Sequence, residues 1–148
     1  MNFKRLVSAI LVGFVFISAT DFLIHGLWLK SDYLATASLW RTQAEMGATM
    51  KWILVSEILY AVTFVTIWAK GFADRSPCLK CACMYGLFMG LFLQVSTCIS
   101  YAVSPVPSGL VLKWFFSGLA QTVLLGIVTF FVYKPLPSGT GDVKDPGK

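Results

Sequence analysis

Residues 6–29 read LVSAILVGFVFISATDFLIHGLWL, an apolar stretch that contains two ionisable side chains, Asp21 and His25. A transmembrane helix needs about 20 mostly apolar residues to cross the hydrocarbon layer of a bilayer. The stretch is therefore long enough to span a membrane, and its two ionisable residues lie inside the span.

Three further stretches have the same character, at residues 52–69, 81–104 and 109–133. Because a bilayer offers no water to unpaired backbone groups, helices are the economical structure for such spans. We therefore predict an all-α fold, a four-helix transmembrane bundle that forms a single domain over residues 1–133. Residues 134–148 are rich in proline and glycine and predict a disordered cytoplasmic tail.

The composition agrees with a membrane protein. Hydrophobic residues make up 57% of the chain and charged residues 13%, against about 25% charged residues in ordinary soluble domains. This balance excludes a disordered chain, a collagen and a nucleic-acid-binding domain, despite the net charge of +5. One His and four Cys in an apolar background also exclude a small secreted domain held by disulfides.

Basic residues predict the orientation, because Lys and Arg are enriched in cytoplasmic segments. Eight of them fall on one predicted face and four on the other. The eight are Lys4, Arg5, Lys70, Arg75, Lys80, Lys134, Lys144 and Lys148, and the four are Lys30, Arg41, Lys51 and Lys113. Both termini are therefore predicted to be cytoplasmic.

The connection between the first two spans predicts a short amphipathic helix over residues 33–46 on the outer side. Asp32 is a suitable N-cap for this helix, and Gly47 is a suitable end. Arg41 and Glu45 are four residues apart, which predicts an ion pair on its surface. We expect this helix to lie on the membrane or over the mouth of the bundle.

Small residues predict where two of the helices pack together. Gly86 and Gly90 share one face of the third span, and Gly118 and Gly126 share one face of the fourth. Lipid gives helices no hydrophobic reason to associate, so close approach at small residues supplies the contact. We expect these faces to meet within one chain, with a homodimer through the same residues as the alternative.

Asp21, His25 and Glu57 are the ionisable residues within the predicted spans that are hardest to explain. A rise of 1.5 Å per residue puts them about 12, 6 and 7–8 Å below the outer ends of their helices. They therefore share one layer, and Gln94 of the third span is a further polar residue for this cluster. Charged groups in a bilayer are costly, so they are expected to face the bundle interior.

Three interpretations of this cluster are open. The first is a structural set of hydrogen bonds. The second is a site in which carboxylates beside an imidazole take up protons or ions. The third is a metal site with two carboxylates and one His, a weak ligand set for Zn²⁺ or Cu²⁺.

The cysteines are the second unusual feature. Cys78, Cys81 and Cys83 lie at the cytoplasmic mouth of the third span. Three thiols suit capture of a soft metal such as Cu(I) or Zn²⁺, or a redox role, although a closed structural zinc site needs a fourth ligand. Lipid anchoring and plain apolar packing are the alternatives. No other cofactor is expected.

A series of residues resembles a widespread family of small four-helix bacterial membrane proteins of unknown function. Its parts are Asp21-Phe-Leu-Ile-His25-Gly26, Tyr33, Leu39-Trp40-Arg41, Glu45-Met46, Lys70-Gly71 and Tyr133-Lys134. The resemblance covers nearly the whole chain before the tail and implies a four-helix protein of the bacterial inner membrane. It implies no activity, and the cysteine run is not part of the pattern.

The sequence contains no phosphate-binding glycine loop, no haem-attachment motif and no nucleophile with a histidine partner at the same level. We therefore expect a structural or accessory subunit of a membrane complex without catalytic activity of its own. Its expected partners are the bilayer and other membrane subunits or a second copy of the chain, and nucleic acid is not among them. The alternative is a small proton or cation transporter that uses Asp21, His25 and Glu57, and a third possibility is a metal or redox role for the cysteines.

Overall fold

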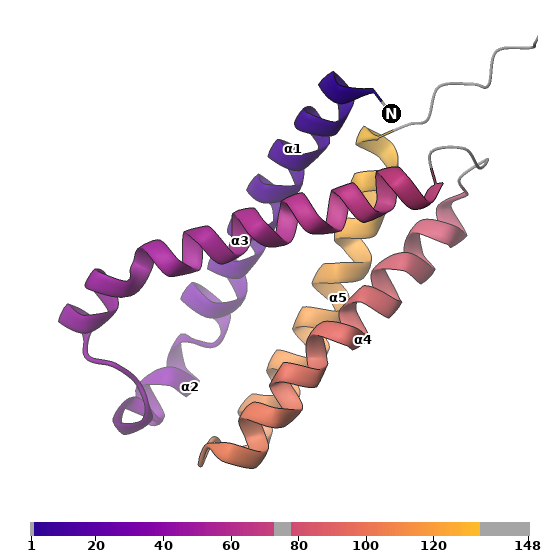
Figure 1. Ribbon diagram of the computed structural model, residues 1–148. Helices are drawn as coiled ribbons and strands as arrows, with labels where there is room; N and C mark the ends of the chain where they lie inside the picture. The colour runs from indigo at the N-terminus through magenta and orange to yellow at the C-terminus, as the bar shows by residue number, and fades with distance from the viewer. Residues whose placement is uncertain (1, 73–77, 134–148) are drawn as a thin grey trace, which may run out of the picture.

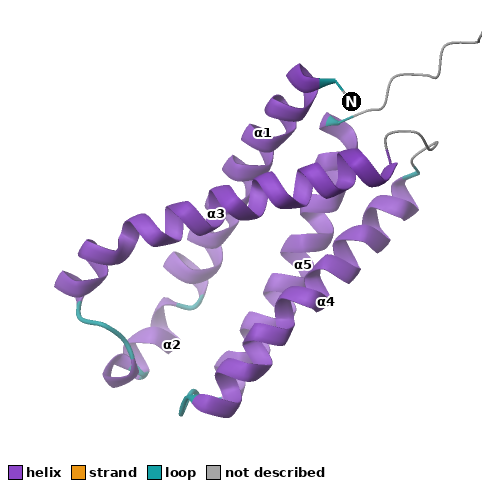
Figure 2. Ribbon diagram, in the orientation of Figure 1, coloured by secondary structure: helices purple, strands orange, loops and turns teal. Residues whose placement is uncertain are grey.

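The computed structural model describes residues 2–72 and 78–133, and every regular element in these ranges is helical (Figure 2). Within these ranges, four helices are long and apolar enough to cross a membrane, in agreement with the predicted number of spans. In chain order the elements are α1 (Phe3–Asp21), the π-helix η1 (Phe22–Trp28), α2 (Lys30–Ala35), the 3₁₀-helix η2 (Ala37–Leu39), α3 (Gln43–Phe72), α4 (Leu79–Val103) and α5 (Ser108–Val132). The tail predicted to be disordered, 134–148, lies outside the described residues.

The bounds predicted for the amphipathic helix, 33–46, are wrong. The helical turn α2 ends at Ala35, and α3 already begins at Gln43, so that Glu45 and Gly47 belong to the long helix. The reason is a capping box. The Glu45 carboxylate accepts hydrogen bonds from the Thr42 backbone N–H (2.8 Å) and hydroxyl (2.9 Å), and the Thr42 hydroxyl accepts one from the Glu45 N–H (3.4 Å).

The long helices form two pairs, α4 with α5 and α1 with α3, and the contact between α1 and α5 joins the pairs (Figure 1). Helices α4 and α5 lie side by side along their lengths, while α1 packs on both α3 and α5. We call the end with α2, η2 and the α4–α5 turn the Trp114 end, and the opposite end, where α4 begins, the Cys78 end.

Buried apolar side chains fill the centre and the Cys78 end of the bundle. At the Cys78 end, Trp68 packs with Leu6 and Tyr133. At the centre, Phe64 packs with Ile17 and Leu125. A separate apolar cluster lies at the Trp114 end around Leu29, Val106 and Leu110. The polar side chains that link α1 to its neighbours lie between these clusters.

Helix α3 leaves the bundle toward its N-terminus (Figure 1). Residues 50–56 are all exposed, and the Trp52 side chain is 65% exposed. By contrast, Ala61, Phe64, Val65, Trp68 and Ala69 in its other half are buried. One half of α3 therefore packs inside the bundle, and the other half is uncovered.

Candidate functional site

Glu57 contacts α1 through a single hydrogen bond. The Ser18 hydroxyl donates to the Glu57 carboxylate over 2.5 Å, which links α1 to the point where α3 starts to leave the bundle. The donor is neutral, and Glu57 forms no ion pair with a described residue. Glu57 is half-buried, so this carboxylate is neither fully enclosed nor electrostatically compensated within residues 2–72 and 78–133.

Asp21, one helical turn after Ser18, contacts α5 instead. The Gln121 side-chain amide donates to the Asp21 carboxylate (2.7 Å) and to the Thr20 hydroxyl oxygen (2.6 Å). The Thr20 hydroxyl donates in turn to the backbone carbonyl of Phe16 (2.8 Å), which orients it as an acceptor. Glu57 of α3 and Gln121 of α5 therefore contact neighbouring turns of α1, at Ser18 and at Asp21.

A π-helical segment begins directly after Asp21. In η1 the backbone hydrogen bonds span five residues, as in the 2.8 Å bond from the Leu29 N–H to the Ile24 carbonyl. Such segments are rare and are often found at functional sites. The wider turn rotates His25 away from the position that regular α-helical spacing predicts, and His25 contacts Tyr33 rather than the two carboxylates.

The contact between His25 and Tyr33 is part of a defined hydrogen-bond chain. The Trp114 indole N–H donates to the Tyr33 hydroxyl oxygen over 2.8 Å. The indole has no acceptor, so the Tyr33 O–H can donate to His25 Nδ1, 2.6 Å away, when that nitrogen carries no proton. Burial raises the pKa of the Tyr33 hydroxyl, although the hydrogen bond from Trp114 opposes this. The phenol thus stays protonated, and in this arrangement the neutral imidazole carries its proton on Nε2.

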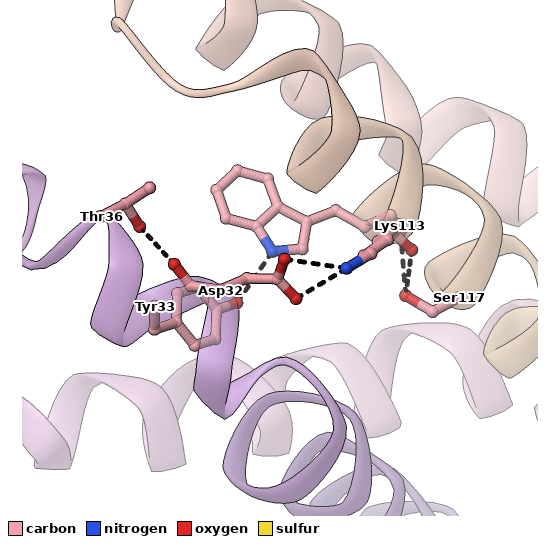
Figure 3. Close-up of polar contacts among 6 residues, drawn as sticks. Asp32, Tyr33, Thr36, Lys113 and Ser117 are labelled. Atoms are coloured by element: carbon pink, nitrogen blue, oxygen red, sulfur yellow. Dashed lines mark hydrogen bonds and ion pairs between the residues drawn. The ribbon is translucent and has the colours of Figure 1, made fainter.

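An ion pair closes the same region (Figure 3). The Lys113 ammonium donates to both carboxylate oxygens of Asp32 over 2.8 Å each, joining α5 to α2. Trp40 packs edge-on against Tyr33 and Trp114 and donates its indole N–H to the Thr36 hydroxyl (2.9 Å). These contacts hold the segment between α1 and α3 against the start of α5.

A cavity of about 290 Å³ lies between η1, α4 and α5. Its lining is about half polar and half apolar, and the polar side chains come from His25, Gln94, Thr97, Trp114, Ser117 and Gln121. Gln94 is only 6% exposed, and its carbonyl oxygen accepts a hydrogen bond from the Thr97 hydroxyl (2.8 Å). Gly118 makes room for its amide, since an added Cβ there would lie 2.5 Å from Gln94 Nε2.

The structure therefore distributes the predicted polar cluster over two places. Asp21 lies one turn of α1 after Ser18, the residue that Glu57 contacts. His25 and Gln94 instead line the cavity that Gln121 connects to Asp21. Within residues 2–72 and 78–133, no group of three or more His, Cys, Asp or Glu side chains is arranged to hold a metal ion. The Arg41 and Glu45 side chains form no ion pair, because Glu45 caps α3.

The cysteines are also divided. Cys78 and Cys81 are in direct contact, with their sulfur atoms 2.6 Å apart, whereas Cys83 makes no such contact. Helical spacing explains this, because residues three apart share a face and residues two apart do not.

The predicted glycines lie between α4 and α5: an added Cβ at Gly86 or Gly90 would collide with Thr122, and one at Gly126 with the Ala82 carbonyl.

Four residues that define this region were not predicted as site residues from the sequence: Gln121, Tyr33, Trp114 and Lys113, the partner of Asp32. A signal was present for Gln121, since an amide in the middle of an apolar span needs a partner there. The Lys113–Asp32 pair joins residues 81 positions apart, so no local pattern reveals it.

No family model matches the chain, and neither the curated proteins nor the solved structures contain a match. The class of protein therefore rests on the fold itself: the regular elements of the described residues are all helical, and four of these helices are long and apolar enough to span a membrane.

Proposed function

We propose that this chain is a protein of the bacterial inner membrane that serves as a non-catalytic accessory subunit, with both termini in the cytoplasm and the Trp114 end outside. The excess of Lys and Arg toward the Cys78 end supports the orientation. The resemblance to small four-helix bacterial proteins supports the localisation. The specific role is to bind one transmembrane helix of a larger partner.

The observation that carries this proposal is the electrostatic state of Glu57. Its carboxylate lies about 7–8 Å inside the apolar part of α3, and its one partner is the neutral Ser18 hydroxyl. A carboxylate in the membrane is costly unless it is paired or protonated. No described residue of this chain pairs with it. A Lys or Arg side chain on a partner helix would remove this cost.

The surface around Glu57 has room for such a helix. The half of α3 that precedes Glu57 is uncovered, with Ile53, Leu54 and Val55 all about half exposed. This half of α3 lies away from α4 and α5, and no helix of the described residues covers it (Figure 1). Apolar contact along this surface and a charge pair at Glu57 together specify a partner with one basic residue in its outer half.

The test is purification of the full chain from its native membrane in mild detergent, followed by quantitative mass spectrometry of what accompanies it. We expect a stoichiometric membrane protein whose recovery falls at least about tenfold with Glu57→Gln. The glutamine still accepts the Ser18 hydrogen bond, so the chain keeps its own fold. Replacing the basic residue of the partner span by Met is expected to cause the same loss.

Asp21→Asn is the matched control, because the Asp21 carboxylate contacts Gln121 of α5 and does not adjoin the uncovered half of α3. It removes a carboxylate from the same layer and is expected to leave the partner bound. Recovery of the same proteins with Glu57→Gln as with the wild type contradicts the proposal, and so does a homo-oligomer that Glu57→Gln leaves intact.

A second candidate function is uptake of a proton or small cation from the outside. The cavity favours it, because a half-polar volume of about 290 Å³ has both His25 and the Asp21 partner Gln121 in its wall. The hydrogen-bond donor to Asp21, the Gln121 amide, is also neutral. Binding a proton or a cation would therefore lower the cost of the Asp21 charge in the membrane. The expected result is pH-dependent proton flux in proteoliposomes that Asp21→Asn abolishes, and absence of flux in the wild type contradicts this candidate.

A further inference from the structure

Cys78 and Cys81 form a structurally distinct pair at the opposite end of the molecule from the polar site. Cys78 is the N-cap of α4, with extended backbone angles (φ −114°, ψ 157°), and Cys81 lies in the first turn of the helix. Their sulfur atoms are 2.6 Å apart. Two thiols in direct contact can be joined with little movement of the backbone, which is the geometric requirement for a reversible disulfide.

The two thiols differ in their surroundings. Cys78 is exposed, whereas Cys81 is half-buried. The Cys78 sulfur accepts hydrogen bonds from the Cys81 side chain and from the Cys81 backbone N–H (3.2 Å), and these contacts lower the pKa of Cys78. A thiolate at the N-terminus of a helix is further stabilised by the backbone dipoles. The exposed thiol is therefore the nucleophile, and the covered thiol is placed to react second.

We infer that Cys78 and Cys81 are a redox-active dithiol that exchanges with small-molecule or protein disulfides, independently of the polar site. The Cys78 thiolate attacks one sulfur of a disulfide R–S–S–R′, forms a Cys78–S–S–R bond and releases R′–S⁻. The Cys81 thiolate then attacks the Cys78 sulfur, forms the Cys78–Cys81 disulfide and releases R–S⁻. Two electrons pass from the dithiol to the substrate, and the protons of the two thiols go to the released thiolates.

This geometry selects a redox pair over a metal site. A soft-metal site at the cysteine run would use Cys83 as the third ligand. The Cys83 sulfur is not in contact with the other two, and no three-ligand group is found among the described residues. Cys83 is therefore expected to be dispensable for the chemistry of the pair.

The experiment oxidises the full-length protein in detergent with glutathione disulfide and counts free thiols with a mass-tagged maleimide. The reduced chain carries four tags, one per cysteine, and oxidation is expected to leave two. Trypsin cleaves after Lys80, between the two cysteines, so the bond appears as two peptides that separate on reduction. Cys83→Ser and Cys98→Ser are the controls, and each is expected to lose two tags on oxidation as the wild type does.

Single variants of the pair test the order of the two steps. Cys81→Ser removes the second thiol, so the reaction is expected to stop with one glutathione on Cys78. Cys78→Ser is expected to form an adduct at Cys81 several times more slowly, because the Cys81 thiol is less exposed to the oxidant than the Cys78 thiol. Retention of four tags by the oxidised wild type, a disulfide to Cys83 or Cys98, or one bound Zn²⁺ that Cys83→Ser releases would each overturn the inference.

Discussion

Helices α4 and α5 stay together along their lengths, whereas α1 and α3 meet at one end and diverge at the other (Figure 1). In the first pair, glycines let the backbones touch: an added Cβ at Gly126 would lie 2.5 Å from the Ala82 carbonyl oxygen. In the second pair, an added Cβ at Gly13 would lie 3.5 Å from Val65, an ordinary distance. All four helices are apolar, so apolar character alone does not decide which of them pair. The size of the side chains at the contact decides it.

The largest expected effect is at the glycine contact. Gly126→Ala places a methyl group against the Ala82 backbone and is expected to lower the free energy of unfolding by about 1–3 kcal/mol. Gly13→Ala is the matched control, since the same methyl group fits there. The control is expected to be neutral or to stabilise the chain by up to about 1 kcal/mol through helix propensity. Thermal and SDS titrations in detergent measure both, and equal effects would show that close packing does not distinguish the two pairs.

A smaller effect is expected where α1 contacts α5 through polar groups. Gln121→Leu removes the donor of Asp21 and leaves a partly buried carboxylate without a hydrogen bond, which costs about 1–3 kcal/mol. Asp21→Asn keeps an acceptor for Gln121 and is expected to change stability by less than about 1 kcal/mol. The same unfolding titration separates the two variants. If Asp21→Asn lowers the free energy of unfolding more than Gln121→Leu does, the Asp21 charge stabilises the bundle more than the hydrogen bond to Gln121 does.

The smallest effect is expected at the Lys113–Asp32 pair between α5 and α2. The two side chains are 41% and 28% exposed, so water and salt screen their attraction. Lys113→Met is expected to cost about 0.2–1 kcal/mol at low salt and less at high salt. Lys51→Met, at an exposed lysine outside this pair, is the control and is expected to have no salt-dependent effect. A cost at Lys113 that is independent of salt would indicate lost packing on Tyr33 and Trp114 instead.

The four spans could be predicted from the sequence because the requirement is local: each is a continuous apolar stretch of sufficient length. The start of α3 at Gln43 was also encoded, in the capping pair Thr42 and Glu45, although Gly47 was expected to end a helix. Gly47 has no positive φ and continues the helix. The departure of α3 from the bundle was not predictable, because it depends on contacts that its first half does not make.

The candidate site was predictable in its residue types and only in part in its arrangement. A polar layer near the Trp114 end follows from the depths of Asp21, His25 and Glu57. The assumption of regular helical spacing then failed at η1, where the π-helical turn directs His25 to Tyr33. In the same way, three thiols within six residues suggested one site, and helical spacing brought only Cys78 and Cys81 together.

The amino-acid sequence by itself determined which segments are helical and long enough to cross a bilayer, because burial in lipid depends on the length and polarity of each segment alone. It also determined that polar groups within those segments would need partners. Only the tertiary structure decided which partners they have: Glu57 takes Ser18, Asp21 takes Gln121 and Asp32 takes Lys113. These pairs join residues between 39 and 100 positions apart, and their distances depend on how the helices cross.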